Sequence, residues 1–165
     1  MKWSENDELF KSLVTEGHSW QSLPLLFLRL SGLNAEMPDL TIREDITSAD
    51  EWLETYDISC NGKLLEVKTR PFVFTSPGDW PQSRLPAFLD TTKKWRAKTI
   101  KPFAYIFVSK PTGAMVATCA LAGAEVRWGK VRRRDHVRNF VEEFYTVGQE
   151  HLVTMDKLVA ALKKA

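Results

Sequence analysis

The residues of this chain best suited to chemistry lie on either side of an Asn61-Gly62 pair. Asn-Gly between two short runs with alternating apolar residues predicts a two-residue β-hairpin, because a type I′ turn needs positive φ at both central positions. Counting outward from this turn places Asp57 opposite Glu66, with Cβ atoms about 4.5–5.5 Å apart. Two like charges at that distance are destabilising unless something offsets them, and a divalent cation such as Mg²⁺ would do so.

Lys68 extends the same arrangement. It follows Glu66 by two residues, so the two-residue period of a strand places both side chains on one face. Leu65 and Val67 then point the other way, toward a core. The hairpin is therefore predicted to present two acids and one base on a single face.

Two acids and a lysine in the spacing D-x8-E-V-K on a hairpin resemble the PD-(D/E)xK nuclease superfamily. The resemblance is carried by Asp57, Glu66 and Lys68, which match that motif position by position. It implies that Asp57, Glu66 and the backbone carbonyl of Val67 hold Mg²⁺ or Mn²⁺, with Lys68 beside the attacking water. It also implies hydrolysis of phosphodiester bonds, with DNA favoured over RNA.

Other acids compete for roles in this site. Asp39 stands in Met37-Pro38-Asp39, a literal Pro-Asp, and is the alternative to Asp57 as the first acid. Members of the superfamily often place a glutamate on the N-terminal helix near the metal, which makes Glu16 a further candidate ligand. Glu5 and Glu8 compete with Glu16 for that place, and an ordinary surface position is equally compatible with Glu16.

Periodicity predicts helices at about residues 4–14, 20–31, 90–99, 136–145 and 152–164. Strands are predicted near 40–42, 55–60, 63–69, 103–108 and 114–118, and a long loop at 71–89. The resulting order resembles the αβββαβ core of the superfamily. We therefore expect one α/β domain over residues 1–165, of restriction-endonuclease-like fold, with a central mixed sheet flanked by helices and extra C-terminal helices. The segments 74–77 and 111–115 are similar to loops of small phage and bacterial members.

Charge is unevenly distributed along the chain. Residues 1–70 hold 13 acids and 7 bases, which leaves 8 acids and 16 bases in the remainder of a chain with 21 and 23 in total. A metal site beside a basic surface suits a polyanionic substrate. The candidate phosphate-binding residues lie in two basic segments and are Lys93, Lys94, Lys98, Arg132 and Arg133. Trp95 and Trp128 are interleaved with them, although core positions are the more common place for tryptophan.

Several other classes of protein are disfavoured. Cys60 and Cys119 have no C-x-x-C spacing, so neither a zinc site nor a disulfide framework is indicated, and a cytoplasmic location is expected. The longest apolar run, residues 23–28, is too short to span a bilayer, and no membrane partner is expected. The three histidines lack metal-ligand spacing, and no P-loop or G-x-S-x-G motif is present.

Two alternatives to an active nuclease stay open from the sequence. The chain could keep the nuclease fold without catalysis, as a nucleic-acid-binding or protein-interaction module. It could also be a small structural phage protein whose acidic N-terminal half and basic C-terminal half associate between copies. A homodimer is a further expectation, because many members of the superfamily dimerise to cut two strands.

Overall fold

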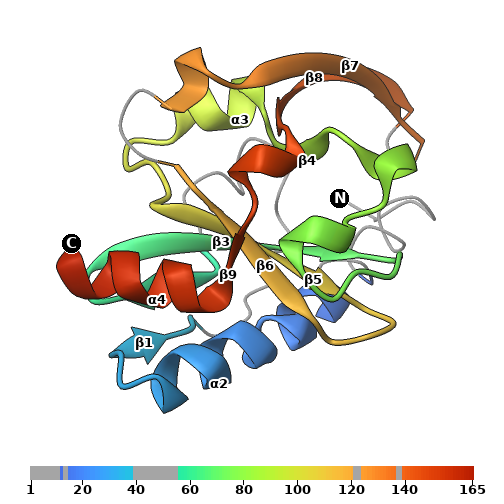
Figure 1. The fold of residues 1–165 in the computed structure, drawn as a ribbon. Coiled ribbons are helices and arrows are strands. Elements are labelled where there is room, and N and C mark those ends of the chain that lie inside the picture. The colour runs from blue at the N-terminus through green and yellow to red at the C-terminus, as the bar shows by residue number, and fades with distance from the viewer. Residues whose placement is uncertain (1–11, 13–14, 39–55, 121–123, 137–138) are drawn as a thin grey trace.

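The computed structural model describes residues 12, 15–38, 56–120, 124–136 and 139–165 (Figure 1). The predicted strand at 40–42 and nearly all of the predicted helix at 4–14 lie outside these residues. Asp39, Glu5 and Glu8 lie outside them as well.

A six-stranded mixed sheet forms the centre of the molecule, in the order β1-β2-β3-β5-β6-β9 (Figure 1). Its strands are β1 (Ala35–Glu36), β2 (Ile58–Cys60), β3 (Lys63–Arg70), β5 (Ala104–Ser109), β6 (Met115–Cys119) and β9 (Val153–Thr154). β3 and β5 run parallel, and all other neighbours are antiparallel. The predicted α/β class is confirmed.

The predicted hairpin and its register are confirmed. Cys60 pairs with Lys63, and the ladder continues outward to Ile58 opposite Leu65. Asn61 and Gly62 have φ of 48° and 76°, as a type I′ turn requires. Asp57 directly precedes β2, so it lies where the extended ladder would reach Glu66.

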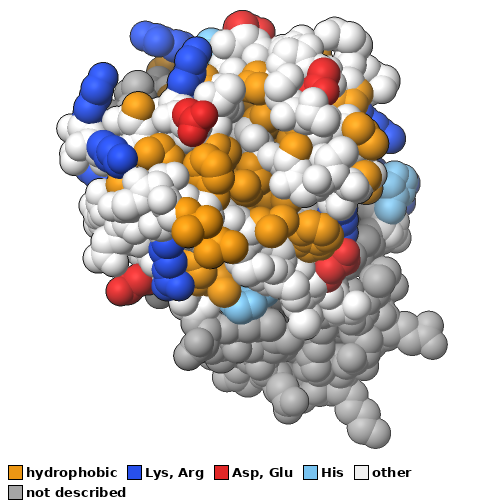
Figure 2. Space-filling view, turned by 60° about the horizontal axis from the view of Figure 1, so that its bottom comes forward, with side chains coloured by type: hydrophobic (Ala, Val, Ile, Leu, Met, Phe, Trp, Pro, Cys, Tyr) orange, Lys and Arg blue, Asp and Glu red, His pale blue; other side chains and the backbone are white. Residues whose placement is uncertain are grey.

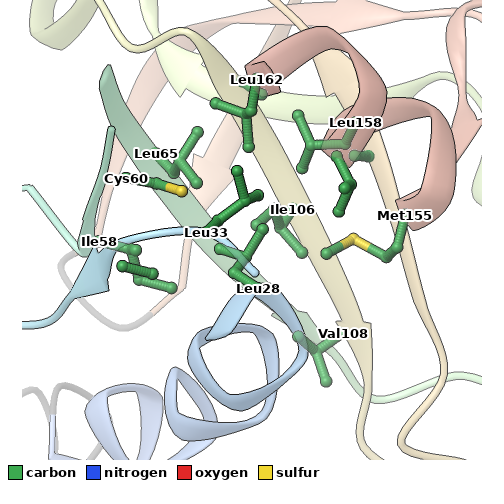
Figure 3. Close-up of a cluster of buried hydrophobic side chains, with 14 residues drawn as sticks. Leu28, Leu33, Ile58, Cys60, Leu65, Ile106, Val108, Met155, Leu158 and Leu162 are labelled. Carbon is green, nitrogen blue, oxygen red and sulfur yellow. The ribbon is translucent and has the colours of Figure 1, made fainter. Parts of the chain in front are cut away.

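Alternation along β3 and β5 separates two layers. Leu65, Ala104 and Ile106 belong to one buried cluster, whereas Tyr105 and Phe107 belong to another on the opposite face of the sheet. Two helices, α2 (Ser22–Leu30) and α4 (Met155–Lys164), cover the first face. Figure 3 shows their leucines meeting the strands in this cluster. Glu66 therefore points toward the second face, as the sequence predicts.

A second, three-stranded antiparallel sheet lies over that other face of the central sheet (Figure 1). Its order is β4 (Ala87–Thr91), β8 (Phe140–Val147), β7 (Gly129–Asp135), and the short helix α3 (Thr92–Ala97) follows β4 directly. An aromatic cluster fills the space between the layers. Its largest members are Phe74, Trp80, Trp95, Tyr105, Phe107, Trp128 and Tyr145.

The predicted helix at 136–145 is wrong, because this region contributes to the β7–β8 hairpin. The segment that forms β8, Phe140-Val141-Glu142-Glu143-Phe144-Tyr145-Thr146-Val147, is rich in aromatic and β-branched residues, which favour strands. Asn139 has φ of 55° immediately before β8, a conformation that ends a helix and suits a turn.

The predicted helix at 90–99 is only partly correct. Residues 87–91 form β4, and the helix spans Thr92–Ala97 with the Thr91 hydroxyl accepting from the Lys94 amide at its N-terminus. The expected loop at 71–89 contains two short 3-10 helices, Pro77–Asp79 and Gln82–Arg84, before β4 begins. Two more 3-10 helices lie at Ala124–Val126 and Gln149–His151.

The predicted strands at 103–108 and 114–118 and helices at 20–31 and 152–164 are present, whereas β1 and β9 have no counterpart among the predictions and β9 takes the place of the first residues of the last helix. α2 ends at Leu30, with Gly32 at φ of 82° two residues later, and all six residues of β5 are buried. α4 begins at Met155, with the Thr154 hydroxyl accepting from the amide of the third helical residue. Of the helices in the described residues, none has the length and hydropathy of a membrane span.

Hydrophobic side chains also reach the surface. Figure 2 views the molecule from its lower side and shows them gathered near the middle of this face, with Lys and Arg nearer its edge. On α2, Leu26 and Leu30 are 56% and 80% exposed. The charged residues described next lie between the two sheets instead.

Candidate functional site: a buried charge cluster between the two sheets

Glu66 and Asp90 come from different sheets and are joined by one ammonium group. Lys98 Nζ donates to Glu66 Oε1 and, at 2.9 Å, to Asp90 Oδ2. All three side chains are buried. Burying charged groups is costly unless they are paired, so this bridge supplies both buried carboxylates with a cationic partner between the layers.

Asp90 is the centre of the cluster. Its Oδ1 accepts from Lys68 Nζ at 2.8 Å and lies 3.6 Å from Lys94 Nζ. Its Oδ2 accepts from the Tyr105 hydroxyl at 2.8 Å. Together with Lys98, three lysines therefore converge on a single carboxylate. The partner that holds Lys68 thus comes from β4 and not from its own strand, β3.

Asp57 lies at the other side of Glu66. Its Oδ1 accepts from Gln21 Nε2 at 2.8 Å and its Oδ2 accepts from the Val67 amide at 2.7 Å. Burial, followed by the negative charge of Glu66, raises the pKa of Asp57 to about 7, against the opposing effects of Lys68 and the Val67 amide. The predicted proximity of the two acids therefore has an electrostatic consequence in the folded chain.

The pKa values of Asp90 and Lys68 are shifted in the directions that their contacts dictate. Burial alone would raise the pKa of Asp90, but Lys68, Lys94 and Lys98 hold it well below its ordinary value. Burial alone would lower the pKa of Lys68, but Asp90, Glu66 and Asp57 raise it instead. Near neutral pH the cluster thus contains an ionised Asp90, a charged Lys68 and an Asp57 that is partly protonated.

The side chain that binds Asp57 carries an oxygen atom that no hydrogen bond uses. Gln21 Oε1 is the one buried side-chain nitrogen or oxygen in the described part of the chain that has no hydrogen-bond partner. Amide and carboxylate oxygens are the types of ligand that Mg²⁺ accepts, and Gln21 and Asp57 supply one of each. Among the residues that the structure describes, no three His, Cys, Asp or Glu side chains form a ligand set, so the amide and backbone oxygens would have to complete it.

The structure brings together Asp57, Glu66 and Lys68 but places other predicted residues differently. Lys98 was expected on an exposed helical face with Lys94. It is buried instead, because α3 ends at Ala97 and the chain turns Lys98 inward onto Glu66 and Asp90. Lys94 is partly exposed.

The remaining predicted positions lie at the surface. Lys93 is exposed on α3, and Arg132 and Arg133 are exposed on β7. Glu16 does not join Asp57. Its carboxylate accepts from Lys110 at 2.5 Å, and this contact lowers the pKa of Glu16.

Sequence reasoning missed Asp90, Gln21 and Tyr105. Asp90 carried one signal, since it is a lone acid in the apolar run Ala87-Phe88-Leu89-Asp90 and such an acid needs a buried cation. Gln21 immediately precedes α2, and nothing in its sequence surroundings distinguishes it from a solvent-facing residue.

Comparisons with known proteins found no relative of this chain. No protein-family model, no curated protein and no solved structure matches the chain.

Proposed function

We propose that the chain is a Mg²⁺-dependent nuclease that hydrolyses phosphodiester bonds, with DNA as its substrate. The observation that carries the proposal is the convergence of Asp57, Glu66 and Lys68 in one cluster, where the charge of Glu66 raises the pKa of Asp57 and both acids raise that of Lys68. Perturbed groups of this kind gather at functional sites more often than elsewhere.

The side chains have distinct roles in this proposal. Asp57 and Glu66, with Gln21 Oε1 and the Val67 carbonyl as further oxygen donors, would hold the cation. Mg²⁺ bound there would polarise the phosphate and lower the pKa of a bound water. Lys68 would donate hydrogen bonds to negative charge as it develops on the phosphate oxygens. Asp90 would keep the Lys68 ammonium charged and in place, since its carboxylate is 2.8 Å away.

The arrangement of elements supports the same proposal. When β4 and the two 3-10 helices before it are left out, the described elements from α2 to β5 run in the order helix, three strands, helix, strand. The strands among them are neighbours in one mixed sheet. This order is compatible with the αβββαβ core that the resemblance in the motif implies.

A cleavage assay tests the function. The purified protein is incubated with plasmid, single-stranded DNA, branched DNA and RNA, with Mg²⁺ or with EDTA. We expect Mg²⁺-dependent cleavage of DNA, and a loss of at least about a hundredfold in the variants Asp57→Asn, Glu66→Gln and Lys68→Met. Lys63→Ala serves as the matched control, because Lys63 is on β3 but lies against Phe103, away from the cluster.

The assay is decisive in both directions. Cleavage that survives in all three variants, or that persists in EDTA, would place the chemistry elsewhere. Activity that disappears equally in the Lys63→Ala control would show that the hairpin variants act through folding.

One contact favours the non-catalytic alternative, a nucleic-acid-binding module that keeps the nuclease fold. Lys98 Nζ already neutralises Glu66, so the cluster is internally balanced without a cation. Buried ion-pair networks of this kind can be purely structural. Titration with Mg²⁺ or Mn²⁺ separates the two functions: an active site raises the melting temperature with metal concentration, whereas a structural cluster does not respond.

A further inference from the structure

Arg70 continues the line of side chains that contains Glu66 and Lys68. It is two residues past Lys68 on β3, so it lies on the same face about 7 Å further along the strand. Its guanidinium donates to the carbonyls of Thr69 (2.9 Å) and Phe88 (2.6 Å) and lies 5.1 Å from the centre of the Phe107 ring. Contacts from both sheets therefore fix its position.

Arg133 approaches the same place from the second sheet. Its Cζ lies 5.4 Å from the centre of the Phe88 ring, and Phe88 also contacts Phe144 at 5.5 Å between ring centres. These three side chains thus share one face of that sheet. Both guanidinium groups thus contact Phe88, Arg70 at its carbonyl and Arg133 at its ring. Burial, followed by the positive charge of Arg133, lowers the pKa of Arg70 to about 10.

Glu142 is the acid that lies opposite Arg133 in the β7–β8 ladder. Arg70 Nη1 and Nη2 each donate to one carbonyl, and each carries a second N–H group. Two guanidinium groups that lie close together are the complement of an anion with several acceptor oxygens.

We infer that Arg70 and Arg133 form a binding site for a phosphate group of a polynucleotide, one strand repeat beyond Lys68. The inference rests on the proposed function, because it seats a phosphate adjacent to the one that Lys68 would contact. Arg70, fixed by its two carbonyls, supplies a preoriented donor, and the exposed Arg133 closes the site from the other sheet. The phosphate belongs either to an internal phosphodiester or to a strand end.

Binding measurements test this site without requiring turnover. Fluorescence anisotropy is recorded in Ca²⁺, from low to moderate salt, with one oligonucleotide that has hydroxyl groups at both ends and the same oligonucleotide with a 5′ or 3′ phosphate. We expect Arg133→Gln to weaken binding and to flatten the log–log salt slope by about 0.7–0.9, the contribution of one phosphate contact. Equal weakening for all oligonucleotides identifies an internal phosphodiester, and weakening confined to a phosphorylated one identifies a strand end.

Arg134→Gln is the matched control. It removes the same charge from the same strand, but alternation places Arg134 on the opposite face of the sheet. Arg70→Lys is the companion variant, because it keeps the charge but loses the planar fork, and it should also weaken binding. Its melting temperature shows whether it folds.

Two results would overturn the site: binding by Arg133→Gln that equals wild type, or a loss in Arg134→Gln as large as in Arg133→Gln. A wild type that binds through Arg133 but cleaves nothing would refute the nuclease function and leave the site standing. A wild type that cleaves and is indifferent to Arg133 would refute the site alone.

Discussion

Lys68 Nζ lies 2.8 Å from Oδ1 of Asp90, a carboxylate that belongs to the other sheet. The lysine of the hairpin motif is thus positioned by a residue outside the motif. The two sheets must stay docked for Lys68 to keep its place, so the chemistry proposed for the hairpin depends on the second layer.

Asp90→Asn should therefore impair both stability and activity. The substitution leaves Lys68 and Lys98 without their common carboxylate, and removing one partner of a buried ion pair costs about 3–5 kcal/mol. Urea unfolding measures this change in the free energy of unfolding. Asp156→Asn, at an exposed position in the first turn of α4, should change it by less than about 1 kcal/mol. An Asp90 variant as stable as that control would refute the central position given to Asp90.

Asp57→Asn should stabilise the metal-free protein at high pH. The pKa of Asp57 rises from 3.8 to about 7 on folding, so between these values the native state holds a proton that the unfolded state has lost. The contribution of Asp57 to the free energy of unfolding is fully present below about pH 4. It is lost as the pH rises through about 7. The difference corresponds to on the order of 4 kcal/mol at most.

Urea unfolding of wild type and Asp57→Asn from pH 5 to 9 measures this effect. The two curves should diverge as pH rises, with the variant the more stable above pH 7. The new amide can also donate to the unpartnered Gln21 Oε1. Parallel curves over the whole range would show that Asp57 ionises as an exposed aspartate does.

Metal binding should release a proton. A cation that binds between Asp57 and Glu66 requires Asp57 to be ionised, and about half of Asp57 is protonated at pH 7. Calorimetric titration with Mg²⁺ in HEPES and in Tris should therefore indicate release of about 0.5 proton per ion at pH 7 and almost none at pH 8.5. A release that does not depend on pH would point to a metal site without Asp57.

Lys98 and Lys94 should differ sharply, although both lie in the same basic segment. Lys98→Met leaves Glu66 and Asp90 without their bridge and should cost about 3–5 kcal/mol of stability. Lys94 is partly exposed and 3.6 Å from Asp90, so Lys94→Met should cost less than about 1 kcal/mol. Thermal unfolding of the two variants distinguishes them, and equal effects would contradict the buried position of Lys98.

The hairpin could be predicted from the sequence because its determinants are local. Asn61-Gly62 fixes the turn, the turn fixes the register, and alternation then assigns Glu66 and Leu65 to opposite faces. The buried strand β5 and the helix α4 are likewise predictable, since each has a strong apolar pattern over its own length.

The charge cluster could not be predicted in full because its contacts cross between layers. Asp90 meets Lys68 across 22 residues, and Lys98 meets Glu66 across 32. Both contacts depend on the direct passage of the chain from β4 into the short helix α3. The polar residues around this boundary also suit a helix, so the sequence does not indicate where the strand ends. The β7–β8 hairpin was missed for a related reason: its alternating charges, such as Arg133 opposite Glu142, also suit a solvent-facing helix.

The type I′ turn also restricts how the length of this hairpin can vary. One extra residue between Gly62 and Glu66 would exchange the two faces of β3, turning Leu65 and Val67 toward Asp90 and placing Glu66 and Lys68 among the leucines of the helical layer. Two extra residues in each strand would restore the assignment. The number of residues inserted between the turn and the site must therefore be even, whereas the total length of the strand can vary. We expect insertions that preserve the site to add two residues, or a multiple of two, to each strand.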